Sequence, residues 1–132
     1  MTAALFVYGT LRKNVSGSRF FLMERYVTFV GYGRIRGRLC HLGRYPGAIL
    51  TETQDRWVLG EIYQLSDSEE ALRILDEYEG CGPVDVQPWE FKRQRAQAVL
   101  DSGEQLPVWV YTYEGPFAGK RELISGNYRN AS

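Results

Sequence analysis

The alternation of apolar and polar positions predicts a chain built mainly from short strands. The first strand is expected over residues 4–8, where a run of apolar, β-forming residues stops at Gly9. A longer strand is expected over 26–42, and the three glycines within it indicate strong curvature. Further strands are expected over 57–65, 89–100 and 106–113, the last two joined by a turn over 101–105.

A helical spacing of apolar residues predicts one well-defined helix between the strands over 57–65 and 89–100. A capping box over 66–69 is expected to begin this helix, and Gly80 to end it. Its buried stripe is expected to consist of Ala71, Leu72, Leu75 and Tyr78. Weaker signals indicate one or two helical turns over 18–25, a turn or rigid loop over 43–48 and a short helix over 119–128 closed by Gly126.

Five strands and one clear helix in 132 residues predict a single α+β domain over residues 1–132. The curved, glycine-rich strands favour a small barrel over a flat open sheet.

The charge of the chain limits the kinds of partner that it is expected to bind. Sixteen basic and sixteen acidic residues cancel, so nucleic-acid binding through bulk phosphate neutralisation is not expected. Residues 1–50 carry eight basic residues and one acidic residue, whereas 51–132 carry eight and fifteen. This asymmetry predicts either interleaved strands that neutralise each other or a polarised surface.

The small number of cysteines and histidines excludes further kinds of site. Cys40, Cys81 and His41 are too few ligands for a usual structural zinc site. Adjacent residues of a strand point to opposite faces, so Cys40 is interpreted as a core residue and not as a nucleophile paired with His41. Two cysteines, and an N-terminus without a signal-peptide pattern, favour a cytoplasmic protein with no membrane span, metal or cofactor.

The first candidate for chemistry is the sequence VYGTLR at 7–12, directly after the first strand. A chain that leaves a strand through glycine can present consecutive backbone N–H groups to an anion such as a carboxylate. Thr10 would add a hydroxyl and Arg12 a positive charge. A phosphate-binding P-loop is excluded, because GxxxxGK[ST] is absent. The alternative interpretation is a strand-to-loop turn without a ligand.

The second candidate is the acidic helix end LDEYEG at 75–80. The partial negative charge of a helix C-terminus and mutual repulsion among Asp76, Glu77 and Glu79 should both raise carboxylate pKa values. A raised pKa is what a general acid or base near neutral pH requires. The alternative is an exposed acidic helix end.

Glu61 is a third candidate, because it shares a strand face with apolar and aromatic residues. Such a carboxylate either pairs with an arginine or lines a pocket. With thirteen arginines in the chain, a structural ion pair is favoured. The aromatic strand over 109–113 could line a pocket, although core or partner surface is the commoner use.

Six segments together carry a family resemblance: VYGTLR at 7–12, YPG at 45–47, GEIY at 60–63, LDEYEG at 75–80, WVYTYEGP at 109–116 and LISGNY at 123–128. In this order they resemble the gamma-glutamylcyclotransferase-like family, and most closely its gamma-glutamylamine cyclotransferase branch. The resemblance implies a small mixed, largely antiparallel β-barrel with flanking short helices.

The resemblance also implies site residues and a reaction. Tyr8, Gly9, Thr10 and Leu11 would bind the glutamyl moiety of a small-molecule substrate, and Glu79 would be the catalytic acid and base. The reaction would be an intramolecular acyl transfer that cyclises a γ-glutamyl group to 5-oxoproline and releases a free amine. The two-proline segment 81–88 departs from the family pattern and leaves the identity of the amine open.

Two other functions stay open at this point. A non-catalytic module could use the same loop to bind γ-glutamyl or amino-acid metabolites, but it would have no need of Glu79. An interaction domain could use the basic N-terminal half, with an affinity that falls steeply with salt.

Overall fold

The computed structural model describes residues 3–13, 15, 17–52 and 55–128, so both ends of the predicted domain lie outside the described residues. Its elements are, in order, β1 (Ala3–Val7), η1 (Phe20–Leu22), η2 (Glu24–Tyr26), β2 (Val27–His41), β3 (Pro46–Leu50), β4 (Trp57–Leu65), α1 (Ser68–Glu79), β5 (Phe91–Leu100), β6 (Gln105–Tyr113) and β7 (Arg121–Glu122). The predictions of β1, β2, β4, β5, β6, α1 and the helical turns before β2 are confirmed.

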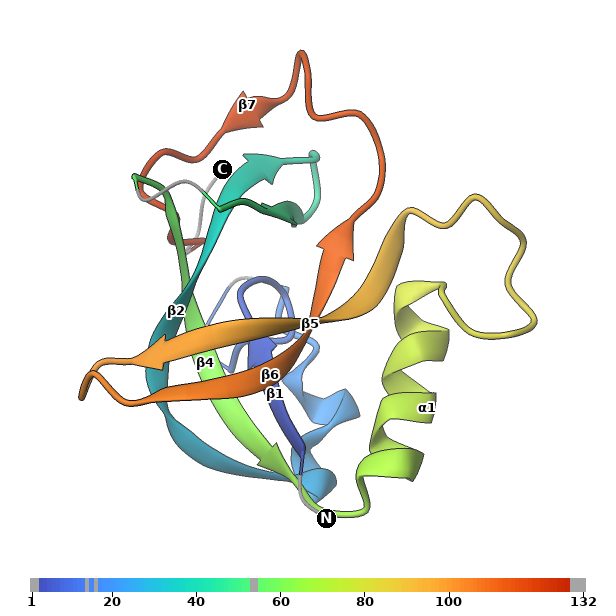
Figure 1. Ribbon diagram of the computed structural model, residues 1–132. Helices are drawn as coiled ribbons and strands as arrows, with labels where there is room; N and C mark the ends of the chain where they lie inside the picture. The colour runs from blue at the N-terminus through green and yellow to red at the C-terminus, as the bar shows by residue number, and fades with distance from the viewer. Residues whose placement is uncertain (1–2, 14, 16, 53–54, 129–132) are drawn as a thin grey trace.

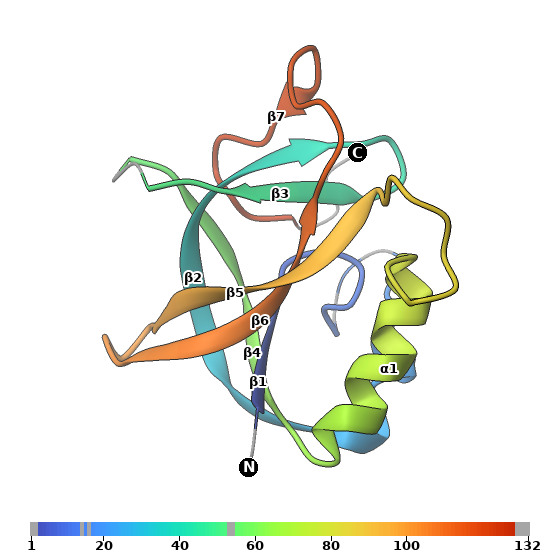
Figure 2. The ribbon, with the colours of Figure 1, turned by 45° about the vertical axis from the view of Figure 1, so that its right-hand side comes forward.

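Five strands close into a small mixed barrel (Figures 1 and 2). They follow the order β2–β4–β1–β6–β5, and β5 pairs back with β2 over Gly33 to Ile35. Strands β1 and β6 are parallel, and every other pair of described strands is antiparallel. Strands β3 and β7 pair with the C-terminal part of β2 and extend its sheet. The predicted α+β barrel is therefore confirmed.

Glycines allow β2 to curve between its partners, as its sequence predicts. A β-bulge lies between Phe29 and Gly31. At Gly33, an added Cβ would lie 2.7 Å from Ile62 Cδ1 and 2.8 Å from the Val99 carbonyl oxygen. No real Cβ is tolerated at such distances without movement, so glycine is what lets β2 approach β4 and β5 together at this point.

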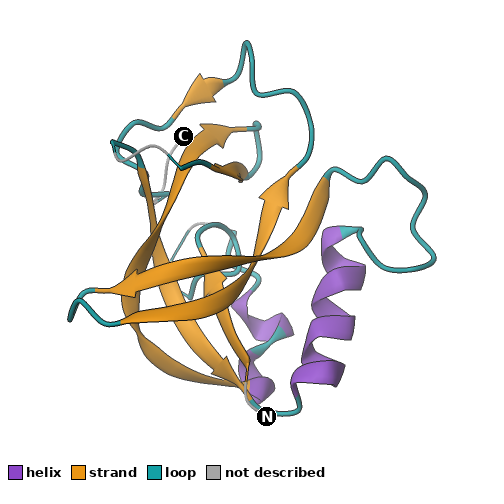
Figure 3. Cartoon of the chain, in the orientation of Figure 1, coloured by secondary structure: helices purple, strands orange, loops and turns teal. Residues whose placement is uncertain are grey.

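Strand β1 is buried on both faces, which explains its continuous apolar sequence. Phe6 points into the barrel, whose core also contains Ile35, Val58, Ile62, Val108 and Val110. Leu5 and Val7 belong to a second core beneath α1, together with Leu72 and Leu75. Helix α1 and the short helices lie on one side of the molecule (Figure 3). The residues at the end of α1 and those that follow β1 line one pocket.

Two details of α1 differ from prediction. The capping box over 66–69 is wrong: the helix begins at Ser68 after Asp67, which has φ 45° and makes no side-chain cap. The Ser66 hydroxyl instead donates to the Tyr26 carbonyl oxygen at 3.2 Å. Tyr78 is 42% exposed and does not belong to the buried stripe. Gly80, with φ 78°, ends the helix as predicted.

Two loop predictions are also wrong. The segment expected as a turn over 43–48 contributes Pro46 and Gly47 to β3, because pairing with the end of β2 overrides the turn signals of proline and glycine. The predicted helix over 119–128 is absent from these described residues. They contain β7, paired with β2, and a turn at Gly126 that has φ 70°.

The charge asymmetry is resolved by contacts between the two halves of the sequence. Arg38 pairs with Glu122 at 2.7 Å, and Arg12 pairs with Glu61 at 3.1 Å. These contacts are those expected of interleaved, mutually neutralising strands. Within the described ranges, no helix has the length and apolar character needed to cross a membrane.

Candidate active site

A pocket of about 210 Å³ opens where β1 ends beside the C-terminal end of α1. Its walls come from segments far apart in sequence: Phe6 to Leu11, Tyr45, Pro46, Tyr78, Glu79, Glu90, Phe91 and Tyr111. The pocket therefore brings together the two segments singled out by the sequence, the loop 8–11 and Glu79. Its volume is below the roughly 300–1,000 Å³ of a drug-sized site, which suits a small metabolite.

The loop after β1 is fixed at its first residue by Tyr8. The buried Tyr8 hydroxyl donates to the Tyr111 carbonyl oxygen at 2.6 Å and accepts from the Ala48 N–H at 3.2 Å. Burial, followed by the nearby Glu79 charge, raises the pKa of this phenol. Tyr8 is therefore a neutral tether that joins the loop to β6 and β3.

Gly9 is required by close packing against Pro46, the first residue of β3. An added Cβ would lie 2.9 Å from Cγ and 3.1 Å from Cδ of Pro46. The Arg12 N–H donates to the Gly9 carbonyl oxygen at 3.0 Å and closes a turn. Within the described part of the chain, the N–H groups of Thr10 and Leu11 donate to no protein acceptor. The loop thus retains two backbone donors beside the pocket, as the anion-binding interpretation requires.

Glu79 is the last residue of α1, and its carboxylate makes no hydrogen bond or ion pair with any other described residue. Its pKa is raised from 4.5 to about 7. Burial is the largest cause, and the charges of Glu90 and Asp76 add to it. The predicted direction of the shift is confirmed, but its main cause, burial against the barrel, was not foreseen.

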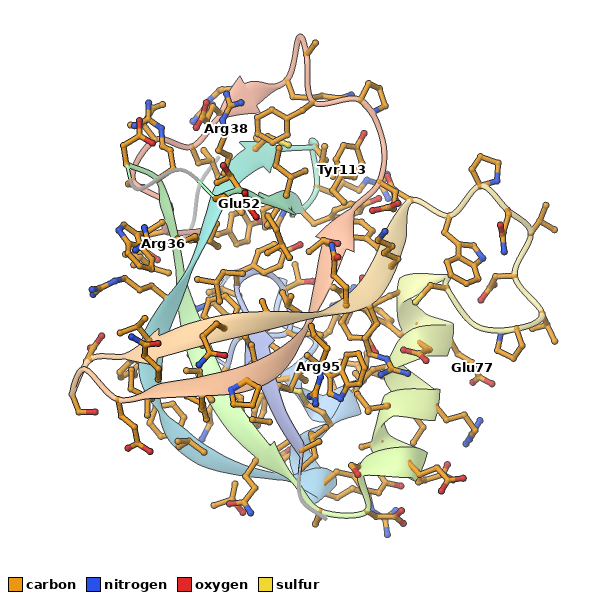
Figure 4. All side chains as sticks on the ribbon, in the orientation of Figure 1. Arg36, Arg38, Glu52, Glu77, Arg95 and Tyr113 are labelled. Carbon is orange, nitrogen blue, oxygen red and sulfur yellow. The ribbon has the colours of Figure 1, made fainter. Side chains whose placement is uncertain are left out.

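The three carboxylates at the helix end have different environments. Asp76 accepts from Arg93 Nε at 2.8 Å and from the Tyr111 hydroxyl at 2.7 Å. Glu77 lies on the outer side of α1, away from the barrel (Figure 4), and pairs with Arg73 at 3.1 Å. The prediction that Glu77 raises the pKa of Glu79 is wrong, since burial, Glu90 and Asp76 are its causes. Of the three, Glu79 lines the pocket.

Sequence reasoning missed Glu90 and Tyr45, which form part of the pocket wall. The Tyr45 hydroxyl donates to Glu90 Oε1 at 2.7 Å, and this bond is the main cause that raises the pKa of Tyr45 to about 12. Glu90 lies just before β5, after the two-proline segment 81–88. No local pattern relates it to α1. The one available signal was the Tyr45-Pro46-Gly47 motif, which was interpreted as a turn and as part of the family resemblance, with no site role assigned to Tyr45.

Glu61 forms the structural ion pair that its sequence context favours. Its carboxylate is buried and accepts from Arg12 Nε at 3.1 Å, the Lys13 N–H at 3.2 Å and the Tyr63 hydroxyl at 2.8 Å. Arg12 Nη1 also donates to Asn127 Oδ1 at 2.9 Å. Glu61 thus anchors the far end of the loop that begins at Tyr8.

The remaining candidates are the Cys40–His41 pair and the aromatic strand over 109–113. Cys40 is fully buried, as predicted, and His41 Nδ1 accepts from the Gly43 N–H at 3.0 Å. In the aromatic strand, Tyr111 lines the pocket, whereas Trp109 stacks with Arg93 and Arg95. Among the described residues, no group of three or more His, Cys, Asp or Glu side chains is placed to hold a metal ion.

Comparison with known proteins relates the chain to one family. The family model described as "Gamma-glutamyl cyclotransferase, AIG2-like" matches residues 5–130. The gamma-glutamylcyclotransferase family protein ytfP of Citrobacter rodentium is 30% identical over 124 residues, which cover 94% of this chain and 93% of the relative. The gamma-glutamylaminecyclotransferase of Rattus norvegicus is 34% identical over 89 residues, which cover 60% of this chain and 56% of the rat protein.

A solved structure extends the similarity to the fold. The crystal structure of an AIG2-like protein from Mus musculus superimposes with a TM-score of 0.72 at 25% sequence identity. The match covers 96% of this chain and 88% of the mouse chain.

Proposed function

The chain belongs to the gamma-glutamyl cyclotransferase, AIG2-like family and is a cyclotransferase enzyme, and on this premise we propose its reaction. The proposed substrate is a γ-glutamylamine, whose γ-glutamyl group is cyclised to 5-oxoproline while the free amine is released. The proposed catalytic unit is a single domain over residues 1–132.

One observation carries this proposal: the unpaired Glu79 carboxylate and the loop 8–11 line the same small pocket. A carboxyl group with a pKa of about 7 can both accept and return a proton near neutral pH. A second set of groups, the N–H donors of Thr10 and Leu11, suits the anionic parts of a glutamyl group.

The proposed mechanism needs one proton carrier. The α-ammonium of the substrate must lose a proton before its nitrogen attacks the γ-carbonyl carbon of the same molecule. Glu79 accepts that proton and then donates it to the nitrogen of the leaving amine as the γ-amide bond breaks. As the five-membered lactam forms, its nitrogen gives up a second proton, which Glu79, again a carboxylate, accepts and passes to the departing amine. The amine then leaves as an ammonium ion, and Glu79 returns to its carboxylate form.

Positioning supplies much of the proposed acceleration, because the attack is intramolecular. The backbone donors of the loop 8–11 would hold the α-carboxylate of the substrate or stabilise the oxyanion that forms at the attacked carbonyl. Tyr8 and Gly9 contribute by fixing the loop: Tyr8 through its two buried hydrogen bonds, and Gly9 through its close approach to Pro46.

The testing experiment is incubation of the purified protein with a panel of γ-glutamyl amines and γ-glutamyl amino acids, with 5-oxoproline and free amine measured together. We expect stoichiometric release of both products from γ-glutamylamines. Turnover should be unchanged in EDTA, since the mechanism uses a carboxylate and backbone donors. Binding of the panel without release of 5-oxoproline would contradict the proposal.

A further inference from the structure

Two carboxylates from different parts of the fold line the pocket: Glu79 at the end of α1 and Glu90 immediately before β5. The mechanism above uses Glu79 alone. Glu90 is nevertheless held in a defined position. Its side chain accepts the Tyr45 hydroxyl at 2.7 Å, and its carbonyl oxygen accepts the Glu114 N–H at 2.7 Å. Tyr45 is itself packed on Phe91, with ring centroids 5.8 Å apart.

We propose that Glu90, fixed by Tyr45, is a positioning residue of the reaction: its negative charge in the same pocket holds the proton on Glu79 and so sets the pH range of turnover. This inference rests on the proposed function of Glu79. It assigns Glu90 an electrostatic task and no contact with the reacting atoms.

Titratable and charged groups lie around Glu79 on several elements. They are Asp76 and Tyr78 on α1, Tyr8 after β1, Tyr45 in the β2–β3 loop, Cys81 after α1, Glu90 and Arg93 at β5, and Tyr111 on β6. Burial raises the pKa of Tyr8, Tyr111 and Cys81, that of Cys81 to about 11, so these groups are neutral at physiological pH.

Two negative charges then act on Glu79, and their surroundings differ. The Asp76 carboxylate accepts two hydrogen bonds from the Arg93 guanidinium, at 2.8 and 3.1 Å, which offsets its charge. The Glu90 carboxylate accepts a neutral phenol hydroxyl, which fixes it without neutralising it. In agreement, Glu90 precedes Asp76 among the charges that raise the pKa of Glu79.

For the reaction, the affinity of Glu79 for its proton must lie between two limits. Glu79 must hold a proton firmly enough to take it from an ammonium group, yet release it to the leaving nitrogen. Removing the Glu90 charge should make Glu79 a stronger acid and therefore a weaker base. Since Glu90 is exposed, added salt should screen part of the same interaction.

The decisive measurement is the pH dependence of kcat/KM for Glu90→Gln against wild type. The acidic limb should move to lower pH by roughly 0.5–1 unit, because the like charge is lost. Added salt should move the wild-type limb in the same direction and the variant's limb less. Tyr45→Phe, which keeps the charge but releases the side chain, should give a smaller displacement than Glu90→Gln.

Glu77→Gln is the matched control, since it removes a carboxylate two residues from Glu79 that points away from the pocket (Figure 4). Its pH profile should coincide with that of wild type. A Glu90→Gln variant with an unmoved acidic limb and a raised KM would overturn the inference, because Glu90 would then contact the substrate. Loss of all turnover in that variant would overturn it equally, because Glu90 would then be the base.

A carbon NMR titration of the Glu79 carboxyl separates this inference from the proposed function. It needs no turnover, so it remains informative if wild type releases no 5-oxoproline. The midpoint for Glu79 should be lower in Glu90→Gln than in wild type. Equal midpoints in the two proteins would overturn the inference even if the enzyme is active.

Discussion

Glu61 in β4 and Glu79 at the end of α1 lie beside opposite ends of the loop that follows β1, and they differ in their hydrogen-bond partners. Glu61 is buried but accepts hydrogen bonds from Arg12, Lys13 and Tyr63. Glu79 lies against the other end of the loop, partly buried, and has no such partner among the described residues. Burial with a cationic partner makes a structural carboxylate, whereas burial without one leaves a group poised to exchange a proton.

The loop between them connects the two environments. Its first residues, Tyr8 to Leu11, face the pocket, and its last residues, Arg12 and Lys13, bind Glu61. Glu61 therefore holds in place the loop whose first residues share the pocket with Glu79. If this comparison is right, removal of Glu79 should mainly change chemistry, and removal of Glu61 should mainly change stability.

The largest effect is expected for Glu79→Gln on turnover. Glutamine preserves shape but accepts no proton from an ammonium group, and general acid–base groups contribute about 10²–10⁴ in rate. Steady-state release of 5-oxoproline should fall by at least that factor, while the affinity for 5-oxoproline changes little. Retention of full turnover in the folded variant would remove Glu79 from the mechanism.

The second prediction concerns Glu61→Gln. The substitution leaves the Arg12 guanidinium buried without its counter-charge, and breaking such a pair costs about 3–5 kcal/mol. Urea denaturation should show a loss of stability of this order. The double variant Arg12→Met/Glu61→Met should recover part of it, because both buried charges disappear together.

A matched comparison is Glu77→Gln, where the ion pair is exposed and its loss should leave the denaturation midpoint unchanged. A Glu61→Gln variant that is as stable as wild type yet inactive would contradict the roles assigned to Glu61 and Glu79. Glu61 would then be the reactive group.

Much of the difference between Glu61 and Glu79 could be predicted from the sequence, because the evidence lies in residues near each of them along the chain. The strand alternation around Glu61 and the number of arginines favour an ion pair, and VYGTLR and LDEYEG identify the two halves of the pocket. The barrel follows from curved strands whose glycines permit close crossings, as at Gly33. In these cases the information lies within one element.

The rest depended on contacts between distant segments. Burial of Glu79 is decided by where α1 packs on β1, and the position of Glu90 by the path of residues 81–90. Strand β3 formed despite Pro46 and Gly47 because the end of β2 offered a free edge. The absent capping box at Asp67 has the same origin, since the Ser66 hydroxyl is used by the Tyr26 carbonyl.

The third prediction concerns the free energy of unfolding that is lost at high pH because the Glu79 carboxylate is buried without a partner. Its pKa is about 7 in the folded protein against 4.5 for an ordinary exposed glutamate, so the folded state binds this proton more tightly than the unfolded state. The resulting stability is fully present below pH 4.5 and lost as pH rises through 7. Glu79→Gln should therefore match wild type at pH 4 and exceed it by up to about 3 kcal/mol at pH 8.

Urea denaturation at the two pH values measures this difference directly. Glu77→Gln provides the reference, since it should show the same stability relative to wild type at both. An equal gain for Glu79→Gln at pH 4 and pH 8 would mean that the substitution acts through packing and that Glu79 ionises as easily as an exposed carboxylate.

The smallest effect is expected from the loop itself, in Gly9→Ala. The new methyl group would lie 2.9 Å from Pro46 Cγ, so the loop must move away from the β2–β3 connection. Overpacking of this size costs about 1–3 kcal/mol. Because binding of 5-oxoproline must bring the loop back to its original position, we expect this cost to appear as at least a fivefold weaker affinity by titration calorimetry. Adding Pro46→Ala removes the colliding ring atoms and should restore most of the affinity, with Pro46→Ala alone as the control.

Failure of this rescue would show that the methyl group obstructs the ligand directly. An unchanged affinity in Gly9→Ala would show that the loop can move without loss of binding, and the N–H donors of Thr10 and Leu11 would then have no part in holding the glutamyl group.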